Sequence, residues 1–128
     1  MSEPIVLICK QRIKRGQLEA YKQIVRRDAE LLFKTKPGTV VYLGYVNEDG
    51  TEASTVHVFP DAESMEAHMQ SVAEMAIAGY RVVENISFEI YGKPSEAILE
   101  ALERVALTGM AVSIKAQTVG GYVRPGSG

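Results

Sequence analysis

The sequence has no tryptophan, a single cysteine and two histidines among its 128 residues. With Cys9 as the only cysteine, no disulfide can form within the chain, so we expect a reducing compartment. No apolar run approaches the roughly 20 residues that a membrane-spanning helix needs. The first apolar run is ended by Lys10 and is too short for a signal peptide. We therefore expect a cytoplasmic protein.

The sequence also lacks a large excess of charge of either sign. The 14 Lys and Arg residues nearly balance the 16 Asp and Glu residues, giving a net charge of −2, and this argues against a nucleic-acid partner. No His or Cys cluster has metal-ligand spacing, and Gly92-Lys93 lacks the glycine spacing of a phosphate loop. Hydrophobic residues make up 46% of the chain, an ordinary globular value. We expect one domain over residues 1–124 and a disordered tail at 125–128.

Hydrophobic periodicity predicts an alternation of strands and helices. The strands are expected over residues 4–13, 39–46, 52–59, 85–91 and 110–123, and the helices over 16–34, 60–79 and 94–108. Asp49-Gly50 fits a tight hairpin turn, and Asp61 is the expected N-cap of the second helix. The strand at 85–91 alternates apolar and polar residues, which we interpret as a half-exposed strand at a sheet edge.

The order of these elements is β-α-β-β-α-β followed by a further helix and strand. This order predicts an α+β, ferredoxin-like split βαβ fold with an antiparallel sheet and both main helices on one face. The strands at 4–13 and 39–46 are nevertheless apolar on both faces. Burying each exposed Val or Ile side chain would contribute about 1.5–3 kcal/mol. We therefore expect a homodimer that packs through the sheet face, with the C-terminal strand extending onto the partner.

Several turn and cap segments carry a family resemblance. They are Pro37-Gly38-Thr39, Asn47-Glu48-Asp49-Gly50-Thr51-Glu52, His57-Val58-Phe59-Pro60-Asp61-Ala62-Glu63-Ser64 and Tyr91-Gly92-Lys93-Pro94-Ser95. Together they make the chain, from about residue 5 to 124, resemble the antibiotic biosynthesis monooxygenase-like family. The resemblance implies a dimeric α+β barrel with a cavity between each sheet and its helices.

The same resemblance implies a choice of chemistries. Some members oxidise polycyclic phenols or quinols with dioxygen and without a bound cofactor, whereas others degrade haem. The tryptophan that haem-degrading members and some of the oxygenases use has no counterpart in this sequence. Haem-degrading members also use a histidine on the second main helix, and His68 is a positional match to it.

The candidate site residues follow from these patterns. They are His68 as the catalytic base or an iron ligand, and His57, Tyr42, Tyr45, Met65 and Met69 as substrate-binding residues. Each has a structural alternative, because buried histidines, tyrosines and methionines often only fill a core or an interface. Met65, His68 and Met69 share the apolar side of their helix with Val72, Met75 and Ala76.

We therefore expect a monooxygenase-like protein that acts on a small aromatic or quinol-type substrate without a cofactor. A non-catalytic protein that binds a small ligand, or binds haem, is the alternative.

Overall fold

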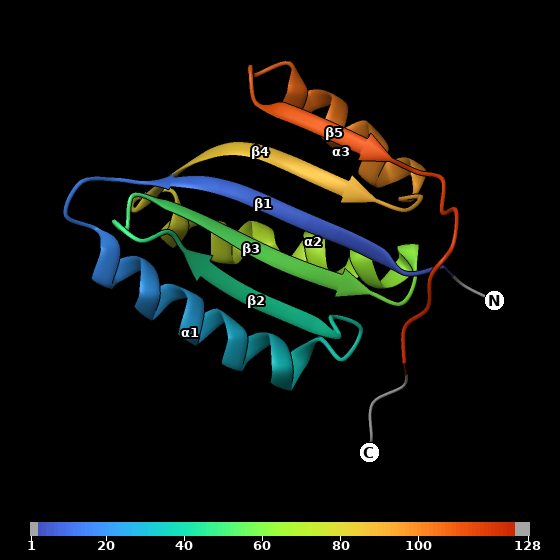
Figure 1. The fold of residues 1–128 in the computed structure, drawn as a ribbon, viewed down its shortest axis with the longest axis horizontal. Coiled ribbons are helices and arrows are strands. Elements are labelled where there is room, and N and C mark those ends of the chain that lie inside the picture. Colours follow the sequence, from blue (N-terminus) through green and yellow to red (C-terminus); the bar gives the residue numbers. More distant parts are fainter. Residues whose placement is uncertain (1–2, 125–128) are drawn as a thin grey trace.

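The fold is a five-stranded sheet with helices on one face (Figure 1). The computed structural model describes residues 3–124, with residues 72–78 described in their main chain only. In chain order the elements are β1 (Ile5–Ile13), α1 (Leu18–Thr35), β2 (Val41–Val46), β3 (Glu52–Phe59), α2 (Ala62–Gly79), β4 (Val83–Tyr91), α3 (Glu96–Ala106) and β5 (Ala111–Lys115). This is the expected α+β arrangement.

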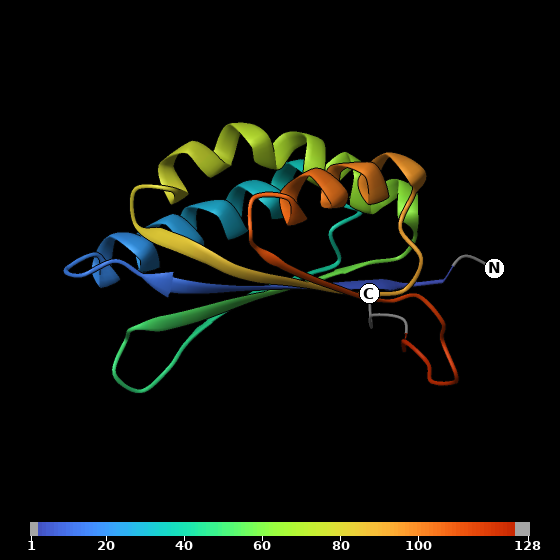
Figure 2. The same ribbon diagram turned by 90° about the horizontal axis from the view of Figure 1, so that it is seen from above.

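The sheet has the order β2-β3-β1-β4-β5. The first four strands pair antiparallel, and β5 pairs parallel with β4. Figure 2 shows α1, α2 and α3 above the sheet and residues 116–124 below it. The helices therefore cover one face, which we call the inner face, and leave the opposite, outer face uncovered.

The core lies between the inner face and the helices. Its largest cluster contains fully buried side chains from three strands and two helices, namely Ile5, Leu7, Phe59, Met65, Ile90, Ile98 and Leu102. A second cluster, at the other end of the sheet, contains Ile13, Tyr21, Ala53, Val82 and Val83. Each large side chain buried in this way contributes about 1.5–3 kcal/mol to folding. The first cluster packs α2 and α3 against the sheet, and the second packs α1 against it.

Short polar side chains fix the helix starts. The Ser64 N–H donates to Asp61 Oδ1 over 2.7 Å, which confirms Asp61 as the cap of α2. The Ile98 N–H donates to Ser95 Oγ over 3.3 Å at the start of α3. Gly50 has φ +71° in the β2–β3 turn, as the Asp-Gly pair predicts.

The prediction that β4 lies at an edge is wrong, because β4 pairs with both β1 and β5. Its apolar–polar alternation arises because one of its faces lies on the uncovered outer face, and alternation does not depend on the position of a strand within the sheet. The edges are β2 and β5. A bulge between Lys10 and Gln11 of β1 shifts the pairing with β4, so that Ser87 faces Lys10 and Asn85 faces Gln11.

The last strand is also shorter than predicted. It ends at Lys115, whereas alternation predicts a strand up to residue 123, and its parallel pairing makes the sheet mixed. Residues 116–124 are exposed and lie on the outer-face side (Figure 2). The predictions for residues 125–128, and for the side chains of Val72, Met75 and Ala76, fall outside the described residues.

The outer face carries an apolar patch over β2, β3 and β1. Register places Val56 opposite both Ile8 and Leu43, and Val58 opposite both Val6 and Val41. These side chains are half-buried or exposed, with Leu43 47% exposed. The prediction that β1 and β2 are apolar on both faces is confirmed.

Candidate functional site

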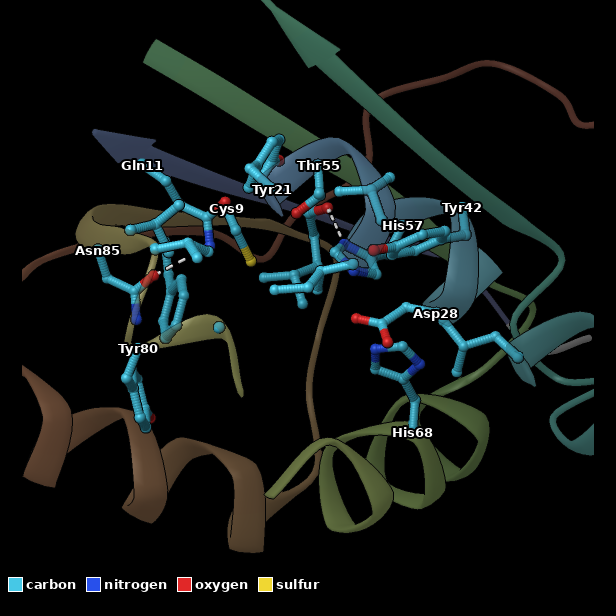
Figure 3. Close-up of a pocket in the computed structure, with 18 of the residues that line it drawn as sticks. Cys9, Gln11, Tyr21, Asp28, Tyr42, Thr55, His57, His68, Tyr80 and Asn85 are labelled. Atoms are coloured by element: carbon cyan, nitrogen blue, oxygen red, sulfur yellow. Dashed lines mark hydrogen bonds between the residues drawn. The ribbon is translucent and has the colours of Figure 1, made fainter. Parts of the chain in front are cut away.

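A cavity of about 310 Å³ lies between the inner sheet face and the helices. This volume is at the lower end of the roughly 300–1,000 Å³ that small-molecule sites span. Its apolar lining comes from the strands and from all three helices, and it includes Leu7, Ile24, Val25, Leu32, Met69, Val83, Phe88 and Val105. Figure 3 shows two groups of polar side chains on opposite sides of the cavity, with Cys9, Tyr21 and Thr55 between them.

His57 enters the cavity from β3. It lies opposite Leu7 of β1 in the register, and its Nδ1–H donates to the Leu7 carbonyl oxygen over 3.2 Å. A carbonyl oxygen can only accept, so Nδ1 carries the ring proton and Nε2 carries the lone pair of the neutral ring. Burial lowers the pKa of His57 to about 4. At neutral pH, His57 is therefore an uncharged proton acceptor in a fixed orientation.

His68 approaches from α2 and meets His57. Their ring centroids lie 5.0 Å apart, and the His68 ring lies equally close to Phe59. Its Nδ1 is 3.0 Å from Thr39 Oγ1, in the loop before β2. Burial, followed by the neighbouring His57 and Lys36, lowers the pKa of His68 to about 3. Both histidines are therefore neutral at pH 7.

Tyr42 and Asp28 complete this end of the cavity. Tyr42 lies opposite His57 in the β2–β3 register, with ring centroids 5.1 Å apart, and burial raises its pKa. Asp28 comes from α1, and its side chain is only 13% exposed. Its carboxylate pairs with Arg27 over 3.0 Å, yet burial still raises its pKa. In Figure 3 the Asp28 carboxylate points into the cavity on the side that carries the two histidines.

The position of α1 depends on a glycine. A Cβ at Gly44 of β2 would lie 2.7 Å from Cγ1 of Val25, a distance that real Cβ contacts essentially never show. Glycine at this position lets α1 approach the inner face closely. Because Asp28 follows Val25 by three residues on the same helix side, this close packing also places the carboxylate in the cavity.

The opposite end of the cavity carries Gln11 and Asn85, and Tyr21 lies between this end and His57 (Figure 3). Gln11 Nε2 donates to Asn85 Oδ1 over 3.1 Å, across the β1–β4 pair. Cys9 lies between the two ends, and burial raises the pKa of its thiol to about 12. The thiol is therefore protonated and unreactive at neutral pH.

The structure brings together four of the six predicted site residues. His57, His68, Tyr42 and Met69 all line the cavity. Met65 is fully buried in the core cluster with Phe59 and is not among the cavity-lining residues.

The prediction that Tyr45 shares this pocket is wrong. Tyr45 pairs with Ser54 and is 57% exposed on the outer face. Side chains alternate along a strand, so Tyr42 and Tyr45, three residues apart, point to opposite faces.

Sequence reasoning missed Asp28, for which a signal existed. The apolar stripe of α1 runs through Tyr21, Val25 and Leu32, and position 28 continues the same helical spacing. A carboxylate inside a buried stripe is a candidate functional group, because ionised side chains are seldom buried without a partner.

Haem does not fit this cavity. Among the described lining residues there is no Lys or Arg to pair with the propionates, and the ionisable carboxylate is that of Asp28. Rings also occupy the space beside His68, because those of His57 and Phe59 each lie 5.0 Å away. Within residues 3–124, apart from the side chains at 72–78, no three His, Cys, Asp or Glu groups lie close enough to hold a metal ion. The searched part of the chain likewise has no helix long and apolar enough to cross a membrane.

No protein-family model and no curated protein sequence matches the chain. Solved structures do match it. MupZ from Pseudomonas fluorescens has 22% identity and a TM-score of 0.73, with 97% of each chain covered. SnoaB from Streptomyces nogalater, a cofactor-independent oxygenase, has 12% identity and a TM-score of 0.61, covering 73% of this chain and 96% of SnoaB.

A third similar structure, from Chloroflexus aurantiacus, is provisionally named an antibiotic biosynthesis monooxygenase. It has 21% identity and a TM-score of 0.58, and the match covers 69% of this chain and 90% of that one. At these identities the likeness shows the fold. The chain thus has the fold of the antibiotic biosynthesis monooxygenase-like proteins, in agreement with the resemblance of its turn and cap segments.

Proposed function

We propose that this protein is a cofactor-independent monooxygenase that acts on a small phenolic or quinol-type aromatic. The observation that carries the proposal is the fixed tautomer of His57, which presents a neutral Nε2 acceptor in an apolar cavity. The fold shared with SnoaB, a cofactor-independent oxygenase, supports the absence of a cofactor.

The reaction balances without an external reductant. A naphthol and one dioxygen give a naphthoquinone and one water, because a ring C–H and the phenolic O–H supply the hydrogen atoms of that water. Carbon loses four electrons and dioxygen gains four. One oxygen atom forms the new carbonyl and the other leaves as water. The protein therefore has to bind the phenol, remove its proton and keep bulk water away while dioxygen reacts with the anion.

His57 is suited to remove that proton. Its hydrogen bond to the Leu7 carbonyl holds the ring, so that Nε2 can accept a phenolic proton without reorientation. Burial causes the low pKa of His57, and that pKa applies to the ring with no ligand beside it. A phenolate anion in contact with the ring raises that pKa, because an opposite charge favours the charged form.

The neighbouring groups support the resulting ion pair. His68 stays neutral when His57 is charged, since the charge on His57 further disfavours its protonation. Asp28 supplies negative charge at the same end and favours a protonated imidazole. Tyr42, beside His57, can donate its O–H to the substrate oxygen.

The test is oxygen uptake by the purified protein with a panel of naphthols and quinols. We expect consumption of one dioxygen per naphthol and, with labelled dioxygen, one labelled atom in the quinone. His57→Gln should lower turnover by at least about 100-fold, within the range that one positioned base contributes. No oxygen uptake above the protein-free rate with any member of the panel would refute the proposal.

A non-catalytic ligand-binding protein is the second candidate, favoured by the low pKa of both histidines in a largely apolar cavity. It predicts that naphthols raise the melting temperature without oxygen uptake. The same panel separates the two functions, because only the oxygenase consumes dioxygen.

A further inference from the structure

Two buried polar atoms of residues that line the cavity lack a hydrogen-bond partner. They are Gln11 Oε1 and the Tyr21 hydroxyl, and no other buried side-chain nitrogen or oxygen of the described residues shares this state. Tyr21 is only 5% exposed. Buried polar groups in folded proteins are nearly always paired, so a pair of unpartnered atoms beside one cavity calls for an explanation.

The packing holds both side chains in place. Gln11 donates from Nε2 to Asn85 Oδ1, which leaves Oε1 as its unused acceptor. Tyr21 packs in the cluster that contains Ile13 and Ala53, at the same end of the sheet. Both residues line the cavity that also holds His57. A partner for these two atoms can therefore come from a ligand in that cavity.

We propose that Gln11 and Tyr21 form a second polar subsite that binds a hydroxyl group of the substrate, remote from the hydroxyl at His57. This inference rests on the proposed function for its substrate class. The enzyme would then act on dihydroxylated aromatics of more than one ring.

A hydroxyl fits the two atoms better than other groups. Gln11 Oε1 can only accept, so its partner must donate, whereas the Tyr21 hydroxyl can donate as well as accept. A ligand hydroxyl donates to Gln11 and accepts from Tyr21. A carbonyl or an ether oxygen has no hydrogen to donate and would leave Gln11 Oε1 unpartnered.

The separation of the two ends sets the size of the ligand. His57 lies opposite Leu7 of β1, and Gln11 lies four residues further along the same strand. Four residues of an antiparallel strand span about 13 Å, which exceeds a single benzene ring even after both side chains reach inward. Two fused rings with hydroxyls at opposite ends meet this requirement, and the cavity of about 310 Å³ limits the ligand to a small ring system.

The experiment compares two ligands that differ by the remote hydroxyl alone, 2-naphthol and 2,6-dihydroxynaphthalene. Affinity is measured by calorimetry without oxygen, so that no turnover is involved. We expect the wild-type protein to bind the dihydroxy compound about 10-fold more tightly, the effect of pairing a buried polar group. Tyr21→Phe should abolish this preference and leave the affinity for 2-naphthol unchanged. Tyr122→Phe, in the exposed segment after β5, is the matched control and should retain the preference.

Each outcome decides the matter. Equal affinity of the wild-type protein for the two ligands, or a preference that survives in Tyr21→Phe, overturns the subsite. Retained 2-naphthol binding by Tyr21→Phe shows that the variant is folded, and its melting temperature without ligand should equal or exceed that of the wild type, because it loses an unpartnered hydroxyl. A Tyr21-dependent preference in a protein that consumes no oxygen would support the subsite and refute the oxygenase proposal.

Discussion

The imidazole rings of His57 and His68 meet edge to face, with their centroids 5.0 Å apart. One ring is held by the Leu7 carbonyl of the sheet, and the other is next to Thr39 in the loop before β2. Both are almost fully buried. The contact therefore joins α2 to the sheet through two groups that can each take up a proton, and protonation of either disfavours protonation of the other.

This contact predicts a loss of stability in mild acid. The pKa values of His57 and His68 are lowered from 6.5 to about 4 and about 3, so between these values and 6.5 the unfolded chain binds more protons than the folded one. The free energy of unfolding is therefore not reduced by the two histidines above pH 6.5, and it falls as the pH drops below that value. At pH 5 the loss is about 2 kcal/mol for each histidine. We expect the melting temperature to fall by about 15 °C between pH 7 and pH 5, as measured by calorimetry.

The double variant His57→Gln and His68→Gln is the control, and its melting temperature should stay nearly constant over the same interval. Asp28, whose raised pKa acts in the opposite direction, is common to both proteins and cancels in the comparison. A wild-type melting temperature that does not change between pH 7 and pH 5 would contradict the neutral, buried state of the two rings.

We expect removal of the Asp28 charge to lower activity without lowering the stability of the fold. Because its folded-state pKa is raised, the ionised carboxylate is less favourable in the folded protein than in the unfolded chain at pH 7. Asp28→Asn should therefore lower oxygen uptake with naphthols by about 10-fold or more, while the melting temperature stays equal or rises. Glu30→Gln is the matched control, because Glu30 lies two residues away on the exposed side of α1 and pairs with Lys34 over 2.9 Å. Unchanged turnover in Asp28→Asn would remove Asp28 from the mechanism.

Periodicity in the sequence predicted the elements well and the site only partly. Helix starts at Asp61 and Ser95, and the turn at Gly50, depend on local chemistry that a sequence displays directly. Strand order, in contrast, depends on pairing between strands that are distant in the sequence. The alternation in β4 shows which of its faces is uncovered. It does not indicate an edge position, because that depends on where β5 pairs.

The site residues show the same division. The pairing of His57 with Tyr42 needs the register of the β2–β3 hairpin, which the turn length fixes, and the register also removes Tyr45 from the cavity. The unpartnered state of Gln11 and Tyr21 could not be predicted, because it depends on three elements that meet only in the folded chain. Asp28 could have been predicted from its place in the apolar stripe of α1.

The uncovered outer face of the sheet carries an apolar patch that is suited to join two copies of the chain. We propose that two copies pack through the apolar patch over β2, β3 and β1, at whose centre Val56 lies opposite both Ile8 and Leu43. Light scattering at micromolar concentration should give twice the chain mass of 14.0 kDa. Val56→Glu places a charge in the middle of the patch and should yield a folded monomer, because the outer face of a single copy is open to water. Leu107→Glu makes the same chemical change at an exposed residue after α3 and should leave the dimer intact. A wild-type monomer at these concentrations, or a Val56→Glu dimer as stable as the wild type, would show that this patch does not join two copies.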